Sequence, residues 1–248
     1  SLLNVEADLD VVGFYNAAYM ITVTCAGMVF SAMETDYFPR LSAVGHNREA
    51  MCETVNRQIE VSMLLISPLL AFLIVFMPIV IPLLFTSEFA PVVDLAQVAV
   101  LSMYLKAISL PMAYLQLAKG DSKGYLLLER VYDVIFVLLV VFGYRHLGLW
   151  GTGAALTVSY VVDVVIVYSY IRMRYGYKIS APVVRLALVQ IPLGLAVYLT
   201  TLSDYVWLSW TLGLLLSLVS LMVSFRILRK KASLWDALLG KLCSKFKS

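Results

Sequence analysis

Charged side chains are scarce in this chain of 248 residues, since Asp, Glu, Lys and Arg together make up only 14% of it. A typical soluble domain carries about 25%. Hydrophobic residues make up 61% of the sequence, and the mean hydropathy is +0.87. One soluble core cannot bury this much apolar side chain, so lipid must cover the remainder. The composition therefore predicts an integral membrane protein.

Cysteine and histidine are also rare. The three cysteines, Cys25, Cys52 and Cys243, are too few and too widely spaced for a disulfide framework. The two histidines, His46 and His146, give no ligand spacing for a metal. We therefore predict no metal centre and no other cofactor.

Motifs of bond-making chemistry are absent as well. The sequence has no G-x-S-x-G, no phosphate-binding Walker loop and no H-E-x-x-H. The 19 Lys and Arg residues give a net charge of only +3, and they do not form one patch beside stacking aromatics, as nucleic-acid binding requires. These absences predict a protein that is not an enzyme and has no nucleic-acid partner.

Long apolar runs dominate the sequence instead. A helix needs about 20 apolar residues to cross the hydrocarbon of a bilayer. Seven stretches reach that length: 11–33, 61–86, 94–117, 127–146, 149–171, 183–203 and 205–225. The prolines inside these runs are compatible with membrane helices, because neighbouring helices and water satisfy the carbonyls that proline frees. The predicted fold is an all-α bundle of about seven transmembrane helices.

Basic residues are concentrated on one side of this arrangement. They occur after the first, third and fifth stretches and in the C-terminal tail, whereas the opposite side has only Arg145. Because cytoplasmic loops keep the positive charge, we expect the N-terminus outside and the C-terminus in the cytoplasm. The tail 230–248 has the pattern of a basic amphipathic helix on the inner leaflet. A basic tail that only fixes the topology is the alternative.

Four ionisable residues lie inside the predicted spans: Lys106, Arg130, Asp133 and Asp163. A charge near the bilayer centre costs at least about 2.5–3.5 kcal/mol, so such groups normally face protein or a water-filled cavity. Arg130 and Asp133 are three residues apart and share a helix face. Together the four groups predict a polar internal cavity. The alternative is that Lys106 pairs with Asp133 or Asp163, and Arg130 with Glu129 or Asp133, as ion pairs that only join helices.

Uncharged polar residues add to this picture. The first stretch carries five of them: Tyr15, Asn16, Tyr19, Thr22 and Thr24. Such a face is unusual on a helix that lipid surrounds, and it predicts a wet surface; hydrogen bonding at a helix interface is the alternative. Three glutamines in later stretches are interpreted only as interface groups: Gln97, Gln116 and Gln190.

Four short motifs resemble those of one transporter family. They are Val12-Gly-Phe-Tyr-Asn-Ala-Ala-Tyr19, Asp36-Tyr-Phe-Pro-Arg-Leu-Ser42, Phe76-Met-Pro-Ile-Val-Ile-Pro-Leu-Leu-Phe85 and Ala118-Lys-Gly-Asp-Ser-Lys-Gly124. In this order and at this spacing, over about residues 11–175, they resemble polysaccharide flippases of the O-antigen type. These flippases are part of the multidrug/oligosaccharidyl-lipid/polysaccharide exporter superfamily.

The resemblance implies a two-lobe architecture. Residues 1–175 would form the five-helix bundle of the second lobe, residues 176–229 two additional transmembrane helices, and residues 230–248 the cytoplasmic tail. The chain opens with Ser1 and an acidic stretch, and we expect that an N-terminal lobe of the same protein is missing. Its partners would then be that lobe, the membrane lipids and the substrate.

The resemblance also implies a function. Such proteins carry an undecaprenyl-diphosphate-linked oligosaccharide across the bacterial inner membrane by alternating access of a cleft between the lobes. Tyr19 stands near the position where lipid II flippases have a basic residue, which favours a surface-polysaccharide unit over lipid II. The candidate site residues are Lys106, Arg130, Tyr19 and Asn16 for the substrate, and Asp133 and Asp163 for coupling to H⁺ or Na⁺.

Three other readings remain open at this point. A multidrug or cation antiporter of the same superfamily would have the same fold, because function lies in the site and not in the fold. A seven-helix receptor would share the topology, although the stretch 205–225 has no lysine for a retinal Schiff base. A fragment without its other lobe would be only a membrane-inserted half.

Overall fold

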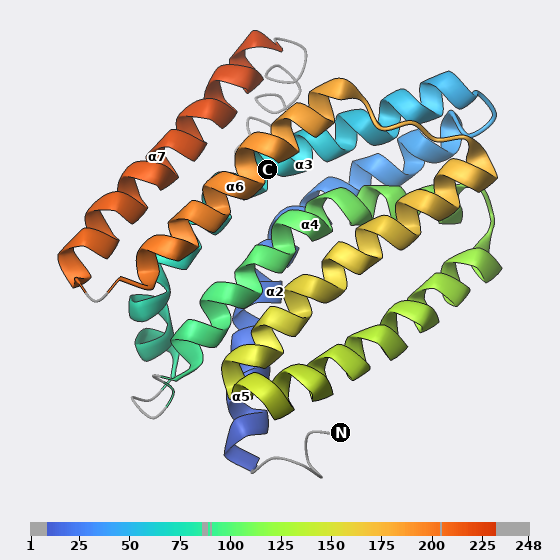
Figure 1. The fold of residues 1–248 in the computed structure, drawn as a ribbon. Helices are drawn as coiled ribbons and strands as arrows, with labels where there is room; N and C mark the ends of the chain where they lie inside the picture. Colours follow the sequence, from blue (N-terminus) through green and yellow to red (C-terminus); the bar gives the residue numbers. More distant parts are fainter. Residues whose placement is uncertain (1–8, 86–88, 90, 204, 232–248) are drawn as a thin grey trace, which may run out of the picture.

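The computed structural model describes residues 9–85, 89, 91–203 and 205–231. These residues form six helical elements: α2 (Leu9–Ala43), α3 (Arg48–Leu84), α4 (Val92–Ala118), α5 (Ser122–Tyr175), α6 (Ala181–Thr201) and α7 (Val206–Lys230) (Figure 1). Within this described part, five helices are long and apolar enough to cross a membrane, and α5 is not among them. The prediction of an all-α membrane protein is confirmed.

Element α5 accounts for two of the seven predicted stretches. Its 54 residues are interrupted at Gly148, where φ is 62° and ψ is −147°. A side chain rarely tolerates this backbone conformation, so glycine permits the reversal. The two limbs then fold back on each other (Figure 1), and they touch closely, because a Cβ on Gly143 or Gly151 would collide with the backbone of the other. The predicted break between 146 and 149 is therefore correct.

The connection predicted between the first two stretches is much shorter than expected. Residues 34–60 do not form a loop, because α2 continues to Ala43 and α3 begins at Arg48. Asn47 caps α3 by accepting hydrogen bonds from two backbone N–H groups. A hydropathy criterion finds only the part of a helix that lies in hydrocarbon, whereas the helix itself continues through polar turns outside it. Arg40 and Arg57 accordingly lie in helices.

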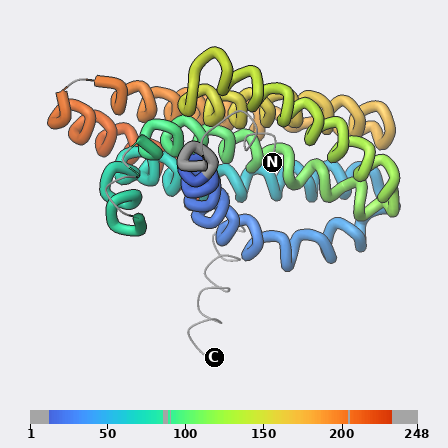
Figure 2. Tube along the Cα trace, turned by 90° about the horizontal axis from the view of Figure 1, so that it is seen from below, coloured from blue at the N-terminus to red at the C-terminus, as the bar shows by residue number. Residues whose placement is uncertain are grey.

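Helix α4 occupies the centre of the bundle. It packs against α2, α3, α5 and α6, and two thirds of its apolar window is buried. Helices α6 and α7 pack on α3 and on each other. Figures 1 and 2 place α7 and the first limb of α5 on opposite sides of α4. The bundle therefore has two distinct sides, one formed by α3, α6 and α7 and the other by α2 and α5.

The basic connections gather at one end of the bundle, at the top and upper right of Figure 1. Arg48 donates to the carbonyl of Gly176 at 2.7 Å, and Lys119 donates to the carbonyl of Gly45. These contacts join α3 and α4 to loops distant in sequence. We call this the basic end. The side of the membrane that this end faces is a prediction. The predicted amphipathic tail lies, from residue 232 on, outside the described residues.

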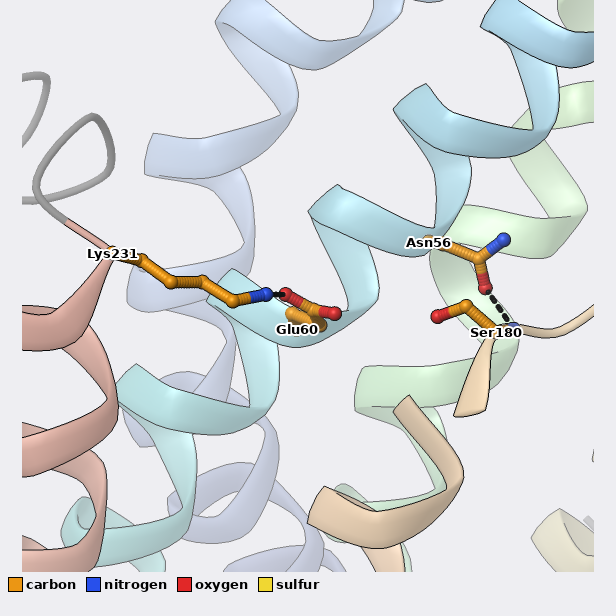
Figure 3. Close-up of polar contacts among 4 residues, drawn as sticks. All are labelled: Asn56, Glu60, Ser180 and Lys231. Carbon is orange, nitrogen blue, oxygen red and sulfur yellow. Dashed lines mark hydrogen bonds and ion pairs between the residues drawn. The ribbon is translucent and has the colours of Figure 1, made fainter. Parts of the chain in front are cut away.

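Asn56 and Glu60 on α3 attach the following segments at this end (Figure 3). The Asn56 side chain donates to the carbonyl of Lys178 at 2.9 Å and accepts from the Tyr177 hydroxyl and the Ser180 N–H, each at 2.9 Å. Glu60 forms an ion pair with Lys231 at the end of α7. Two consecutive turns of α3 thereby fix the start of α6 and the end of α7.

Asp121 joins the two limbs of α5 at the basic end. It caps the first limb through the Gly124 N–H and accepts hydrogen bonds from the hydroxyls of Tyr170 and Tyr175, both at 2.6 Å. These hydrogen bonds, those from the tyrosines first, stabilise the carboxylate and lower the pKa of Asp121 to about 2. The α5 hairpin thus turns at Gly148, and Asp121 joins its two limbs at the other end.

Candidate functional site

Lys106 lies near the middle of α4 with its side chain half-buried. Its Nζ atom stands 5.9 Å from the centre of the Phe30 ring of α2, a cation–π distance. Among the described residues, no carboxylate oxygen lies within 4.0 Å of this nitrogen. Lys106 is therefore a membrane-level cation that α4 and α2 hold in place without a direct ion pair.

Three carboxylates surround Lys106 at longer range. Glu34 of α2, Glu129 of the first limb of α5 and Asp163 of the second limb all act on it electrostatically. Asp163 also interacts with the hydroxyl of Ser109, which lies one turn from Lys106 on α4. We call Glu34, Lys106, Glu129 and Asp163 the charge cluster. If all four groups are ionised, the cluster carries two negative charges in excess.

Four tyrosines adjoin the charge cluster on the same side of the bundle. Tyr15 and Tyr19 stack on α2 with ring centres 6.1 Å apart, and Tyr132 and Tyr160 meet between the limbs of α5 at 5.6 Å. Tyr19 lies within electrostatic range of Tyr132 and Tyr160, and Asp163 lies within the same range of Tyr160. These tyrosines place hydroxyl groups, which can both donate and accept hydrogen bonds, between α2 and α5.

The structure brings some of the predicted site residues together and leaves others exposed and apart. Lys106 and Asp163 come together in the charge cluster, and Tyr19, which is 42% exposed, lies with the tyrosines. Asn16 is exposed on α2, one residue from Tyr15. Arg130 and Asp133 are exposed on the first limb of α5, and with the residues the structure describes they make neither a hydrogen bond nor an ion pair.

Two members of the charge cluster, Glu34 and Glu129, were missed as site residues. Glu34 follows the predicted stretch 11–33, so hydropathy assigned it to a loop, although no glycine ends the helix before Gly45. Glu129 lies next to Arg130, which made a local ion pair the simpler interpretation. The helical spacing from Glu129 to Tyr132 and Phe136 was the available signal, because these residues share one face of the first limb.

Two of the three glutamines predicted as interface groups form hydrogen bonds, on the side of the bundle opposite the charge cluster. Gln190 of α6 donates to the Ser224 hydroxyl at 3.0 Å and accepts from the Ser220 hydroxyl at 2.7 Å. Gln97 donates to the carbonyl of Ile74 at 3.0 Å. Gln190 and Gln97 therefore join helices as predicted. The side chain of Gln116 has no hydrogen-bond partner within the described part of the chain.

Part of this chain is similar to a known protein family, and its fold is similar to that of a solved protein. Residues 6–94, which include all of α2 and α3, match a family profile described as polysaccharide biosynthesis protein. The structure is similar to that of a lipid II flippase, MurJ, in an inward closed conformation, with a TM-score of 0.67 and 13% identity. The chain therefore has the same fold as this flippase over the part that matches. The profile match also supports the predicted resemblance to polysaccharide flippases, over residues 6–94.

The similarity to MurJ concerns part of that protein. The match covers 91% of this chain but only 48% of the flippase, so the chain spans about half the length of its structural relative. No curated protein sequence matches the chain. At 13% identity, the similarity to MurJ establishes the fold and not the function.

Proposed function

We propose that the chain forms one lobe of a transporter that moves lipid-linked oligosaccharide units across a bacterial inner membrane. The observation that carries this proposal is the match of α2 and α3 to a polysaccharide biosynthesis family within a chain of flippase fold. The substrate is an undecaprenyl-diphosphate-linked precursor of a surface polysaccharide, such as O-antigen. Transport proceeds by alternating access, with no covalent chemistry, between this lobe and an N-terminal one.

The proposed path follows the side of the bundle where α2 and α5 meet. A sugar diphosphate headgroup cannot cross hydrocarbon alone, because each desolvated hydroxyl and charge would lose its hydrogen bonds to water. Lys106 attracts the diphosphate, and Tyr19 and Asn16 bind sugar hydroxyls. Arg130, exposed on the first limb of α5, offers a second cation. Residues 1–175 form the lobe proper in this proposal, and residues 176–229 flank it.

The driving force can come from the membrane potential. Moving one negative charge out of a negative interior releases about 2.3 kcal/mol of free energy per 100 mV of membrane potential. Asp163, within the charge cluster, and Asp133 are the carboxylates through which H⁺ or Na⁺ would be coupled. The basic end faces the cytoplasm in this proposal, in agreement with the positive-inside rule, and the N-terminus of the chain lies outside.

Exchange of Lys106 tests the proposed function. In the complete flippase, Lys106→Ala is expected to reduce surface polysaccharide tenfold or more, which corresponds to a lost interaction free energy of about 1.4 kcal/mol for each factor of ten. Lys106→Arg is expected to retain export because the charge remains. Export is measured by quantifying surface glycan against protein abundance in the membrane. Arg226→Ala, at an exposed cation of α7 on the other side of the bundle, is the matched control. Unchanged export in Lys106→Ala at normal abundance would refute the role of this residue.

A cation or multidrug antiporter is the second candidate, and the excess of carboxylates in the charge cluster favours it. Two net negative charges suit a cationic substrate better than a diphosphate. Replacing Glu129 and Asp163 by their amides distinguishes the candidates. An antiporter loses cation efflux, whereas a polysaccharide flippase with Lys106 intact keeps binding its anionic substrate.

A further inference from the structure

A small pocket lies between α2, α3 and α4, next to the charge cluster. Glu34 of α2, Gln58 and Ser62 of α3 and Tyr114 of α4 contribute its polar groups. It has room for about one water-sized occupant. Lys106 does not line it, although the Phe30 ring beneath Lys106 does. The pocket therefore brings side-chain oxygens from three helices around a single small space.

The polar groups of the pocket are poorly satisfied by the protein. Gln58 is only 7% exposed, and its amide has no hydrogen-bond partner within the described residues. The Ser62 hydroxyl has only the sulfur of Met33, at 3.7 Å. The Gln58 amide is not sealed by the surrounding side chains, so an occupant of the pocket can reach it. A small cation there would find the amide oxygen of Gln58 and the hydroxyl oxygen of Ser62 free to contact it.

Glu34 gives the pocket its charge. Its carboxylate interacts with the Tyr114 hydroxyl, and no cation of the described chain lies within 4.0 Å of it. A carboxylate at membrane depth normally pairs with a cation or marks an ion path. The pocket thus combines one negative charge with the amide oxygen of Gln58 and the hydroxyl oxygens of Ser62 and Tyr114.

We propose that this pocket binds Na⁺, with Glu34, Gln58, Ser62 and Tyr114 as its side-chain ligands. Carboxylate, amide and hydroxyl oxygens are the ligands that hard cations prefer. One carboxylate matches a single positive charge, whereas protein sites for divalent cations usually supply several. The small space and the strong field of a carboxylate favour Na⁺ over the larger K⁺.

Occupancy of the pocket has two consequences for the bundle. Na⁺ joins α2 to α3 and α4, so it stabilises the position of α2. It also neutralises Glu34, one of the three carboxylates that act on Lys106. The charge cluster then becomes less negative, which strengthens the attraction of Lys106 for an anionic headgroup. This second consequence rests on the proposed function, whereas Na⁺ binding itself does not.

Thermal unfolding and ²²Na⁺ binding of the chain in lipid nanodiscs test the proposal, without any lipid-linked substrate present. NaCl at about ten times the dissociation constant is expected to raise the melting temperature by about 2–4 °C relative to KCl at equal ionic strength. Glu34→Gln, which is nearly isosteric, is expected to abolish both the shift and the binding. Gln58→Leu weakens binding at least tenfold.

Two control variants make the result specific. Glu53→Gln and Glu49→Gln each remove an exposed carboxylate of α3 that does not line the pocket and is not part of the charge cluster. Both are expected to bind Na⁺ normally. Equal effects of NaCl and KCl, or Na⁺ binding that survives Glu34→Gln, would overturn the proposal. Neither outcome bears on the export test with Lys106, so the two hypotheses fail separately.

Discussion

The two sides of this bundle differ in whether their polar side chains have partners within the protein. On the side of α3, α6 and α7, Gln190 is hydrogen-bonded to Ser220 and Ser224, and Glu60 is paired with Lys231. On the side of α2 and α5, Lys106 and Glu34 have no ion pair among the described residues. Both sides carry polar groups in an apolar chain, and they differ in whether these charged groups are paired.

This difference separates stability from function. A paired group between helices contributes to holding them together, and nothing else is required of it. A charge that the protein leaves without a partner has a solvation cost, which persists only where water, an ion or a substrate offsets it. Under the proposed function, the side of α2 and α5 would bind cargo, and the other side, which we call the scaffold side, would hold the bundle together.

Removing Asn56 is expected to have the largest effect on stability. Asn56→Ala leaves the Tyr177 hydroxyl, the Ser180 N–H and the Lys178 carbonyl without their partner. Because the residue is 8% exposed, water can replace these bonds only in part, and we expect a loss of about 2–4 kcal/mol. Thermal unfolding in detergent or nanodiscs measures it.

The matched variant for this prediction is Asn56→Asp. A carboxylate can still accept from Tyr177 and Ser180 but cannot donate to Lys178, so we expect a smaller loss than in Asn56→Ala. If the two variants were equally destabilised, or if neither lost stability, the scaffold side would not depend on these hydrogen bonds.

Asn56 also illustrates what the sequence could and could not predict. Hydropathy predicted all seven helical stretches, and five of the helices in the described part have the length and composition that lipid imposes on a span, whereas the two limbs of α5 do not meet that criterion. Asn56 lies beyond the end of that signal, in a polar turn of α3 that was assigned to a loop. Its partners are about 120 residues away in the chain, at Tyr177 to Ser180. Single-sequence patterns carry no information on such distant pairs.

The sequence likewise predicted some residues of the candidate site and missed others. Lys106 and Asp163 could be predicted, because any charge inside a span calls for an explanation. Glu34 could not, because it stands just outside the predicted span, and the pocket around it needs α2, α3 and α4 to be in place. Arg130 and Asp133 share a helix face as predicted, yet composition could not tell that this face is exposed.

Gln190→Leu is expected to have an intermediate effect on the scaffold side. The substitution leaves the hydroxyls of Ser220 and Ser224 without the amide between α6 and α7. Hydrogen bonds between membrane helices are worth about 0.6–1.7 kcal/mol, so we expect a loss in that range, with export per molecule unchanged. A double-mutant cycle with Ser220→Ala should give a coupling energy above zero. Strict additivity of the two variants would contradict the assignment.

Lys106→Met is expected to have the smallest effect on stability and so gives the sharpest test of the comparison. Removing one partner of a buried ion pair costs about 3–5 kcal/mol, because the other charge is left alone. Lys106 has no such partner within 4.0 Å among the described residues. Its removal relieves the cost of a poorly solvated cation, which offsets the loss of the Phe30 contact and of the longer-range attraction to three carboxylates. We expect the free energy of unfolding to stay within about 0.5 kcal/mol or to rise, while export falls as in Lys106→Ala. A loss as large as that of Asn56→Ala would mean that Lys106 is part of the scaffold, and the distinction between the two sides would no longer hold.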